Sequence, residues 1–133
     1  MTVATLARRA AVTPDVIRYY ARIGLLHPTR DKQNGYKLFS DQDVKRLSFI
    51  RKARSLGYRL SEIAEILGEA SQGRSPCPRV RDIIRQRIEE NRRRLDELVA
   101  LQERMEQALA TWNDLPDGAP DSQSVCHLIE SDR

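Results

Sequence analysis

Two cysteines and one histidine are the side chains of this sequence best suited to binding a metal ion. Cys77 and Cys126 are its two cysteines, and His127 directly follows the second. Thiolates and imidazole nitrogens bind soft or borderline cations such as zinc, cadmium, lead and mercury. The two thiols could instead pair or be modified by an oxidant, or be inert small apolar residues. His127 is equally interpretable as a surface side chain. Because the N-terminus lacks a secretory signal, we expect a cytoplasmic protein without a structural disulfide.

A second set of functional candidates is basic and aromatic and lies between Thr13 and Phe39. Arg18 could contact a DNA base or a phosphate, and the hydroxyl of Tyr20 could donate to a phosphate. Residues 1–60 carry a net charge of +9, whereas the remainder carries −5. Phosphate neutralisation supplies most non-specific DNA affinity, so the first half is the candidate DNA-binding half. A merely solvated basic surface is the alternative.

A short helix is predicted to position these side chains. Thr13 is a suitable N-cap, Pro14 suits the first turn and Gly24 ends the helix. Apolar side chains at a helical spacing are expected to bury one face: Val16, Ile17, Tyr20 and Ile23. An earlier helix over residues 2–10 is joined to it by about three residues, which is the spacing of a helix-turn-helix.

A hairpin and two more helices are predicted next. Asn34-Gly35 is a strong two-residue hairpin signal, and the returning strand is expected to end at Phe39, which would form a wing. Ser40 and an acid three residues later resemble a capping box. The following short helix is expected to be capped by Ser61 and to end at Gly68, before a Gly- and Ser-rich flexible loop over residues 68–76.

The longest predicted helix runs from about Pro78 to about Trp112 and carries a heptad pattern. The two seam positions hold Ile84, Asn91, Leu98, Met105 and Trp112, and Ile88, Leu95, Gln102 and Leu109. Most are apolar over about four heptads, which predicts a coiled coil, and the polar Asn91 and Gln102 would specify its register. A lone helix would expose this seam, so we predict a homodimer. Packing on its own N-terminal domain is the alternative.

Composition supports a helix-dominated protein with one modest core. The chain has 133 residues, 5% aromatic and 32% charged, and it contains no apolar run of about 18 residues that could span a membrane. No catalytic triad, phosphate-binding glycine loop or carboxylate pair is recognisable, so an enzyme is not predicted. A coiled-coil adaptor would leave the basic hairpin unexplained. The predicted divisions are a winged helix-turn-helix at 1–70, a linker at 71–77, a dimerisation helix at 78–112 and an effector-binding loop and tail at 113–133.

These segments resemble the MerR family of bacterial transcription regulators. The matching stretches are VIRYYARIGLL at 16–26, NGYKLFS at 34–40, DVKRLSFIRKARSLGYRLSEIAEIL at 43–67 and the long helix after Cys77. Lys37 and Phe39 depart mildly, since the family often has arginine and tyrosine there. The resemblance implies a homodimer joined by an antiparallel coiled coil. It also implies a promoter with an overlong spacer, which the effector-bound dimer bends and untwists so that RNA polymerase can engage it.

The resemblance also implies which residues contact DNA. They lie on the recognition helix, the wing and the second helical pair: Thr13, Val16, Arg18, Tyr19, Tyr20, Arg30, Asn34, Tyr36, Lys37, Arg54 and Tyr58. Core packing is the other interpretation of Tyr20 and Tyr36.

In an antiparallel dimer, Cys77 of one subunit would lie beside Cys126 and His127 of the other. A cysteine at the start of the dimerisation helix is typical of family members that respond to divalent ions. This sequence lacks the further cysteine that metal sensors usually have near Trp112, so zinc would need His127, an aspartate such as Asp121 or water. The predicted effector is therefore a divalent ion (zinc, cadmium, lead or mercury), and the alternative is a redox- or electrophile-responsive regulator.

Overall fold

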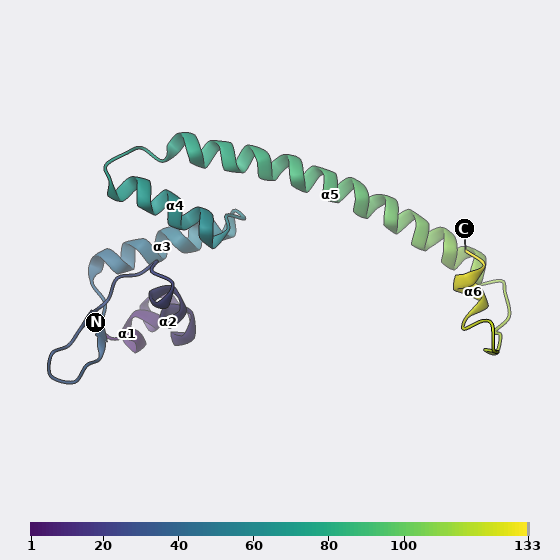
Figure 1. Cartoon of the computed structure of the whole chain (residues 1–133), viewed down its shortest axis with the longest axis horizontal. Helices are drawn as coiled ribbons and strands as arrows, with labels where there is room; N and C mark the ends of the chain where they lie inside the picture. Colours follow the sequence, from purple (N-terminus) through teal and green to yellow (C-terminus); the bar gives the residue numbers. More distant parts are fainter. Residues whose placement is uncertain (133) are drawn as a thin grey trace. The chain divides into compact units, whose positions relative to one another are not determined.

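The computed structural model describes residues 1–132, in which six helices and one two-stranded sheet follow one another (Figure 1). They are α1 (Val3–Ala10), α2 (Pro14–Arg22), β1 (Thr29–Arg30), β2 (Lys37–Leu38), α3 (Asp41–Ser55), α4 (Leu60–Ser71), α5 (Cys77–Trp112) and α6 (His127–Glu130). The predicted helix-dominated fold, with a small antiparallel hairpin and a long late helix, is confirmed. The chain divides into two compact units, Met1–Arg85 and a second that begins at Gln86. Arg133, the last residue of the predicted tail, lies outside the described residues.

The first unit is a helical core built from α1 to α4. Most of its buried side chains recur at helical spacing, as amphipathic helices require, and two more come from the turn after α2. Leu6, Ile17, Leu25, Leu26, Leu47, Ile50, Ile63 and Ile66 are all at most 2% exposed. Val80, Ile83 and Ile84, from the first turns of α5, pack against this core. The start of the long helix therefore belongs to the same packed unit as the helix-turn-helix.

A buried carboxylate fixes the segment after α2 onto α3. Asp43 is 2% exposed, and its side chain accepts hydrogen bonds from the backbone N–H groups of His27 (2.9 Å) and Ser40 (3.0 Å). The Ser40 hydroxyl in turn accepts from the Asp43 N–H, so the predicted capping box is present. Arg46 Nε donates to the carbonyl of Leu25 at 2.8 Å. These bonds hold the approach to the wing, and they satisfy the buried acid.

The wing has a longer loop than the predicted two-residue Asn34–Gly35 turn. Residues 31–36 connect the strands, and Asp31 N–H donates to the carbonyl of Tyr36 at 2.8 Å. The Asp31 carboxylate accepts from two backbone N–H groups within the loop, and the Asn34 side chain accepts from Tyr36 N–H at 2.9 Å. Side chains that bond their own loop compete with strand pairing, which explains why each strand has only two residues.

Three further details differ from the sequence prediction. Helical spacing placed Ile23 on the buried face of α2, but it is 43% exposed, because it lies beyond the last helical residue. Phe39 is buried but lies one residue beyond the end of β2. Its N–H donates to the carbonyl of Met1, and its carbonyl accepts from the amino group of Met1, both at 2.7 Å. The N-cap of α4 is Arg59, and Ser61 is inside the helix. Neighbouring contacts and turn geometry set these positions, which local spacing does not report.

The junction between α4 and α5 is shorter than predicted. α4 passes through Gly68, around which there is open space, and ends at Ser71. The glycine that ends it is Gly73, at φ +77°, where a left-handed backbone favours glycine. The N–H groups of Gly73 and Arg74 donate to carbonyls of the last turn. Because α5 starts at Cys77, the linker is confined to residues 72–76.

Most of α5 leaves its apolar seam uncovered in the single chain. In the second unit, the seam side chains of Ile88, Leu95, Leu98, Met105 and Leu109 are each 50% or more exposed. Ile84 differs, because it packs on the core of the first unit. The first turns of the helix therefore pack on the N-terminal domain, as the alternative expected for the whole helix. No helix within residues 1–132 is long and apolar enough to cross a membrane.

Candidate DNA interface and metal ligands

A basic groove lies where α1, α2 and the wing meet. It has a volume of about 610 Å³ and is lined by Thr2, Val3, Ala4, Arg18, Arg22, Gly35, Tyr36 and Lys37. These lining residues include three cations and no carboxylate. The predicted recognition helix and the predicted wing thus contribute to one positively charged surface, which suits a phosphate backbone.

Arg18 is held loosely within this surface. Its guanidinium lies 2.9 Å from the Asp15 carboxylate, and the two side chains are 58% and 93% exposed. Exposed pairs of this kind contribute about 0–1 kcal/mol, so the arginine can be released at little cost. Arg22 stacks over the ring of Tyr19 at 5.3 Å, and that ring lies 6.1 Å from the ring of Tyr20. Sequence reasoning did not select Arg22, although its position four residues after Arg18 places both on one helix face.

The wing presents its side chains outward. Tyr36 is 66% exposed, so it is not packed in the core. Arg30 donates to the carbonyl of Gly35 at 3.2 Å, so its side chain is held against the loop of the wing. Tyr20, in contrast, is half-buried and packs against the core, as the other interpretation of this residue expected.

Tyr58 is not available to contact DNA in this structure. It is 5% exposed, and its hydroxyl donates to the carbonyl of Val80 in α5 at 2.8 Å. The neighbouring Arg54 donates to the carbonyl of Tyr58 at 3.0 Å and stays exposed. Tyr58 therefore joins the α3–α4 turn to the start of the long helix and is a core residue, not a DNA contact.

Comparison with known proteins identifies the family. Residues 1–70 match the MerR HTH family regulatory proteins, and residues 44–108 match the MerR DNA-binding family. The chain belongs to the MerR family. It is a DNA-binding transcriptional regulator of the MerR type, as its relatives are, and the resemblance noted in the sequence is confirmed.

The relatives that match most of this chain are named as transcriptional regulators, and several of their names include a heavy metal. The transcriptional regulator ZntR of Escherichia coli K12 is 33% identical over 127 residues, covering 95% of this chain and 87% of that protein. The mercuric resistance operon regulatory protein of Bacillus cereus is 32% identical over 128 residues, covering 95% and 92%. The solved structure of MerR from Bacillus megaterium MB1 with mercury(II) matches with a TM-score of 0.57 at 27% identity, covering 94% and 93%. PbrR691 from Ralstonia metallidurans CH34 with lead(II) shares the fold, with a TM-score of 0.78 at 24% identity over 98% of both chains.

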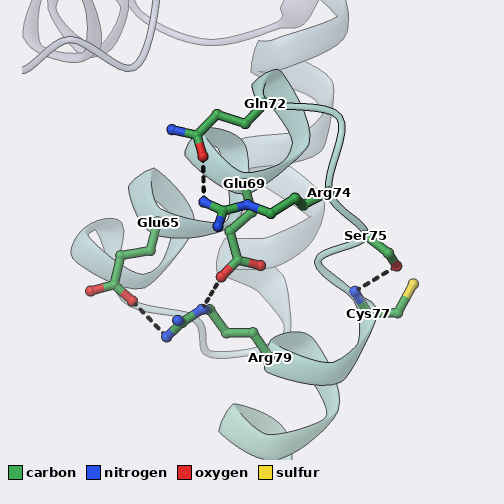
Figure 2. A network of polar contacts seen from close by, with 7 residues as sticks. All are labelled: Glu65, Glu69, Gln72, Arg74, Ser75, Cys77 and Arg79. Atoms are coloured by element: carbon green, nitrogen blue, oxygen red, sulfur yellow. Dashed lines mark hydrogen bonds and ion pairs between the residues drawn. The ribbon is translucent and has the colours of Figure 1, made fainter.

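Cys77 occupies the first position of α5 in this MerR-family chain. Its thiol is exposed, and its N–H donates to the Ser75 hydroxyl at 3.4 Å. In Figure 2 the sulfur points away from the ion pairs of Arg79. A thiol at an exposed helix start can reach a ligand or a second chain without rearrangement of the core.

Arg79 fastens α5 to α4 beside this cysteine (Figure 2). Its Nε lies 2.7 Å from Glu69 and its Nη1 lies 3.2 Å from Glu65. The hydrogen bond and the charge of Glu69 raise the pKa of Arg79 above its ordinary value. The arginine therefore stays charged and cross-links the two helices two residues after the candidate ligand Cys77.

The second cysteine and the histidine lie in an ordered turn after α5. Cys126 is half-buried, and the N–H groups of Val125 and Cys126 donate to one carboxylate oxygen of Glu130 at 2.6 and 2.8 Å. These two bonds lower the pKa of Glu130. The His127 ring places Nε2 at 3.0 Å from the carbonyl oxygen of Pro116. The Glu130 carboxylate thus holds the backbone at Val125 and Cys126, and the Pro116 carbonyl holds the ring of the next residue, His127.

The loop acid Asp121 serves the turn. Its carboxylate accepts from the N–H groups of Gln123 and Ser124 and from the Ser124 hydroxyl, and these bonds lower its pKa. Within residues 1–132 of one chain, no three His, Cys, Asp or Glu side chains form a cluster able to hold a metal ion. Cys126 and His127 are neighbours in one turn of the second unit, whereas Cys77 begins α5 in the first unit.

Proposed function

We propose that this MerR-family regulator is a homodimer that controls a promoter in response to a divalent heavy-metal ion bound between its two subunits. The observation that carries the DNA part of the proposal is the basic groove shared by α1, α2 and the wing. Arg18, Tyr36 and Lys37 are the side chains we assign to DNA contact there. Thr13, Val16, Tyr19, Tyr20, Arg30, Asn34 and Arg54 complete the proposed interface.

The uncovered seam of α5 supports the dimer. A helix of 36 residues is about 54 Å long at 1.5 Å per residue. Its exposed seam residues from Ile88 to Leu109 repeat with the heptad spacing of a two-stranded coil. A second copy running antiparallel would cover this seam and bring Cys77 of one subunit toward Cys126 of the other. Asn91, Gln102 and Trp112 would lie along the same interface.

The donor set fits a soft or borderline divalent ion only if it is shared between subunits. Cys77 from one chain, with Cys126 and His127 from the other, would supply two thiolates and an imidazole. Such donors suit zinc, cadmium, lead or mercury, and the thiols must lose their protons to bind. Each bound ion would connect the start of one α5 to the turn after the other. The metals named for the relatives support this class of effector without selecting one metal.

The expected mechanism is control through DNA deformation. Two winged helix-turn-helix units joined by one coiled coil would bind two half-sites of the operator. A change in the angle between the two units would bend and untwist the spacer between the promoter elements. RNA polymerase in the bacterial cytoplasm could then engage both elements. Arg79 would carry a movement of the Cys77 end of α5 into α4.

Metal titration of the reduced dimer, followed by transcription from the promoter of its own operon, tests this proposal. We expect stoichiometric binding of at least one of the four ions and a transcriptional response that is lost in Cys77→Ser. Ser55→Ala, far in sequence from all three ligands, serves as the control. Absence of binding, with the response retained in Cys77→Ser, would contradict metal sensing. A response to peroxide or aldehyde without metal would favour the redox or electrophile alternative.

A further inference from the structure

The contact between His127 and Pro116 determines which ring nitrogen carries the proton. Nε2 of His127 lies 3.0 Å from the carbonyl oxygen of Pro116. A carbonyl oxygen can only accept a hydrogen bond, so Nε2 must donate one. In the neutral imidazole the other nitrogen, Nδ1, then carries a lone pair and no proton.

Gly118 makes this contact possible. A Cβ atom at residue 118 would lie 2.5 Å from Cδ2 and 2.9 Å from Nε2 of His127, closer than real side-chain carbons approach. Any side chain at this position would push the ring away from Pro116. Glycine is required here because the backbone approaches the His127 ring closely. Its backbone conformation does not require glycine, since Gly118 does not have a left-handed φ.

The backbone that leads into this ring is also held in place. Glu130 accepts the N–H groups of Val125 and Cys126, so the backbone that leads into His127 is held in place. Cys126 and His127 are adjacent, and the one nitrogen not occupied by Pro116 is Nδ1. Histidines that bind metals commonly donate their other ring N–H to a backbone carbonyl, which fixes the tautomer and the ring orientation.

We propose that Pro116 and Gly118 hold His127 as its Nε2–H tautomer, so that Nδ1 is the nitrogen it offers to a borderline divalent cation. Because Nδ1 carries no proton in this state, binding a cation there displaces none from the ring. Gly118 is a positioning residue: it touches the imidazole and not the ion. The tautomer is a property of the metal-free chain, whereas the assignment of Nδ1 as a ligand rests on the proposed function.

Long-range ¹H–¹⁵N NMR of the full-length, metal-free, reduced protein tests the tautomer. His27→Gln leaves His127 as the single imidazole and retains the backbone N–H that bonds Asp43. We expect a protonated Nε2 and an unprotonated Nδ1 in this background. Adding Gly118→Ala should mix the two tautomers, whereas Gly68→Ala, at a helical glycine with open space around it, should leave the spectrum unchanged.

Zinc titration of the same proteins tests the ligand. We expect Zn²⁺ to shift Nδ1 while Nε2 keeps its proton, and Gly118→Ala to weaken zinc binding by about 10–100-fold, as loss of supporting contacts to a ligand does. Coordination through Nε2, or a mixture of tautomers in the metal-free protein, would overturn the inference. A fixed Nε2–H tautomer with no binding of Zn²⁺, Cd²⁺, Pb²⁺ or Hg²⁺ would confirm that Pro116 and Gly118 hold the His127 ring, and it would reject the proposed metal function.

Discussion

Arg18 illustrates how a single residue can be kept ready for a ligand. Asp15 holds its guanidinium on the surface of α2, yet both side chains are well exposed and the pair is weak. DNA can therefore replace the carboxylate without uncovering a buried charge.

We predict that Arg18→Ala weakens operator binding by about 1–3 kcal/mol if the arginine contacts a base. If it contacts a phosphate, the main effect should be a smaller dependence of the operator affinity on salt concentration. Footprinting titrations at two salt concentrations distinguish these outcomes. Arg74→Ala, in the linker between α4 and α5, removes an equal charge outside the groove and should change neither quantity. Unchanged affinity and salt dependence for Arg18→Ala would remove this residue from the interface.

Tyr58 makes the opposite case, a residue that looked like a DNA contact and is part of the core. Tyr58→Phe removes the hydroxyl that donates to the carbonyl of the half-buried Val80 and keeps the ring. We expect a loss of about 0.5–1.5 kcal/mol in the free energy of unfolding, measured by urea denaturation. Operator affinity of the folded protein should stay within about twofold. A large loss of affinity with unchanged stability would restore Tyr58 to the interface.

At the scale of elements, the sequence predicted most of what local chemistry controls. The Thr13 cap, the Ser40–Asp43 capping box and the limits of the long helix were all readable, because caps and heptads are local patterns. The end of α4 was misplaced at Gly68, since a glycine on an open helix surface costs only about 1 kcal/mol and need not end a helix. The Tyr58–Val80 and Gly118–His127 contacts join residues well separated along the chain, and no local pattern reports them.

The turn that carries Cys126 has a predictable pH dependence. Two backbone N–H groups lower the pKa of Glu130 below its ordinary value of 4.5, so its carboxylate stabilises the turn when ionised. A lowered folded-state pKa means that this stabilisation is fully present above about pH 4.5 and is lost as the pH falls through the lower value. Amide hydrogen exchange of Val125 and Cys126 should show protection that disappears in this acidic range.

A matched variant isolates the charge of that carboxylate. Glu130→Gln keeps an oxygen acceptor at the same position but cannot ionise. We expect weaker protection of the two amides at neutral pH, without the further loss on acidification that the wild-type protein shows. Identical pH profiles for the two proteins would show that Glu130 does not hold this turn.

The junction beside Cys77 offers a second test at this scale. Arg79 is about half exposed, so its ion pairs should add less than about 1 kcal/mol to stability. Glu69→Gln should therefore leave unfolding and basal operator affinity nearly unchanged, while reducing the metal-dependent rise in transcription if Arg79 couples α5 to α4. Glu89→Gln, which removes an exposed i,i+3 partner of Arg92 on the same helix, is the control. Equal induction in both variants would show that the ion pair carries no signal.

For the whole molecule, the main question is what covers the seam of α5. Burying five large apolar side chains that each stay 50% or more exposed in one chain would contribute several kcal/mol, at about 25 cal/mol per Å² of apolar surface. Heptad spacing aligns them along one face, and a second α5 presents the same face. A dimer also explains why the proposed ligands are split between the start of α5 and the turn after it.

Leu98→Lys tests this directly by placing a charge in the middle of the seam. We expect sedimentation at micromolar concentration to change from dimer to monomer, because the buried charge would have no partner in the coil. Operator affinity should fall together with dimerisation, since one half-site then binds without the effective concentration supplied by the other. Ala100→Lys adds the same charge on the face away from the seam and should leave both properties unchanged. A Leu98→Lys protein that remains dimeric would show that another surface joins the subunits, and the shared site for Cys77, Cys126 and His127 would then lose its geometric basis.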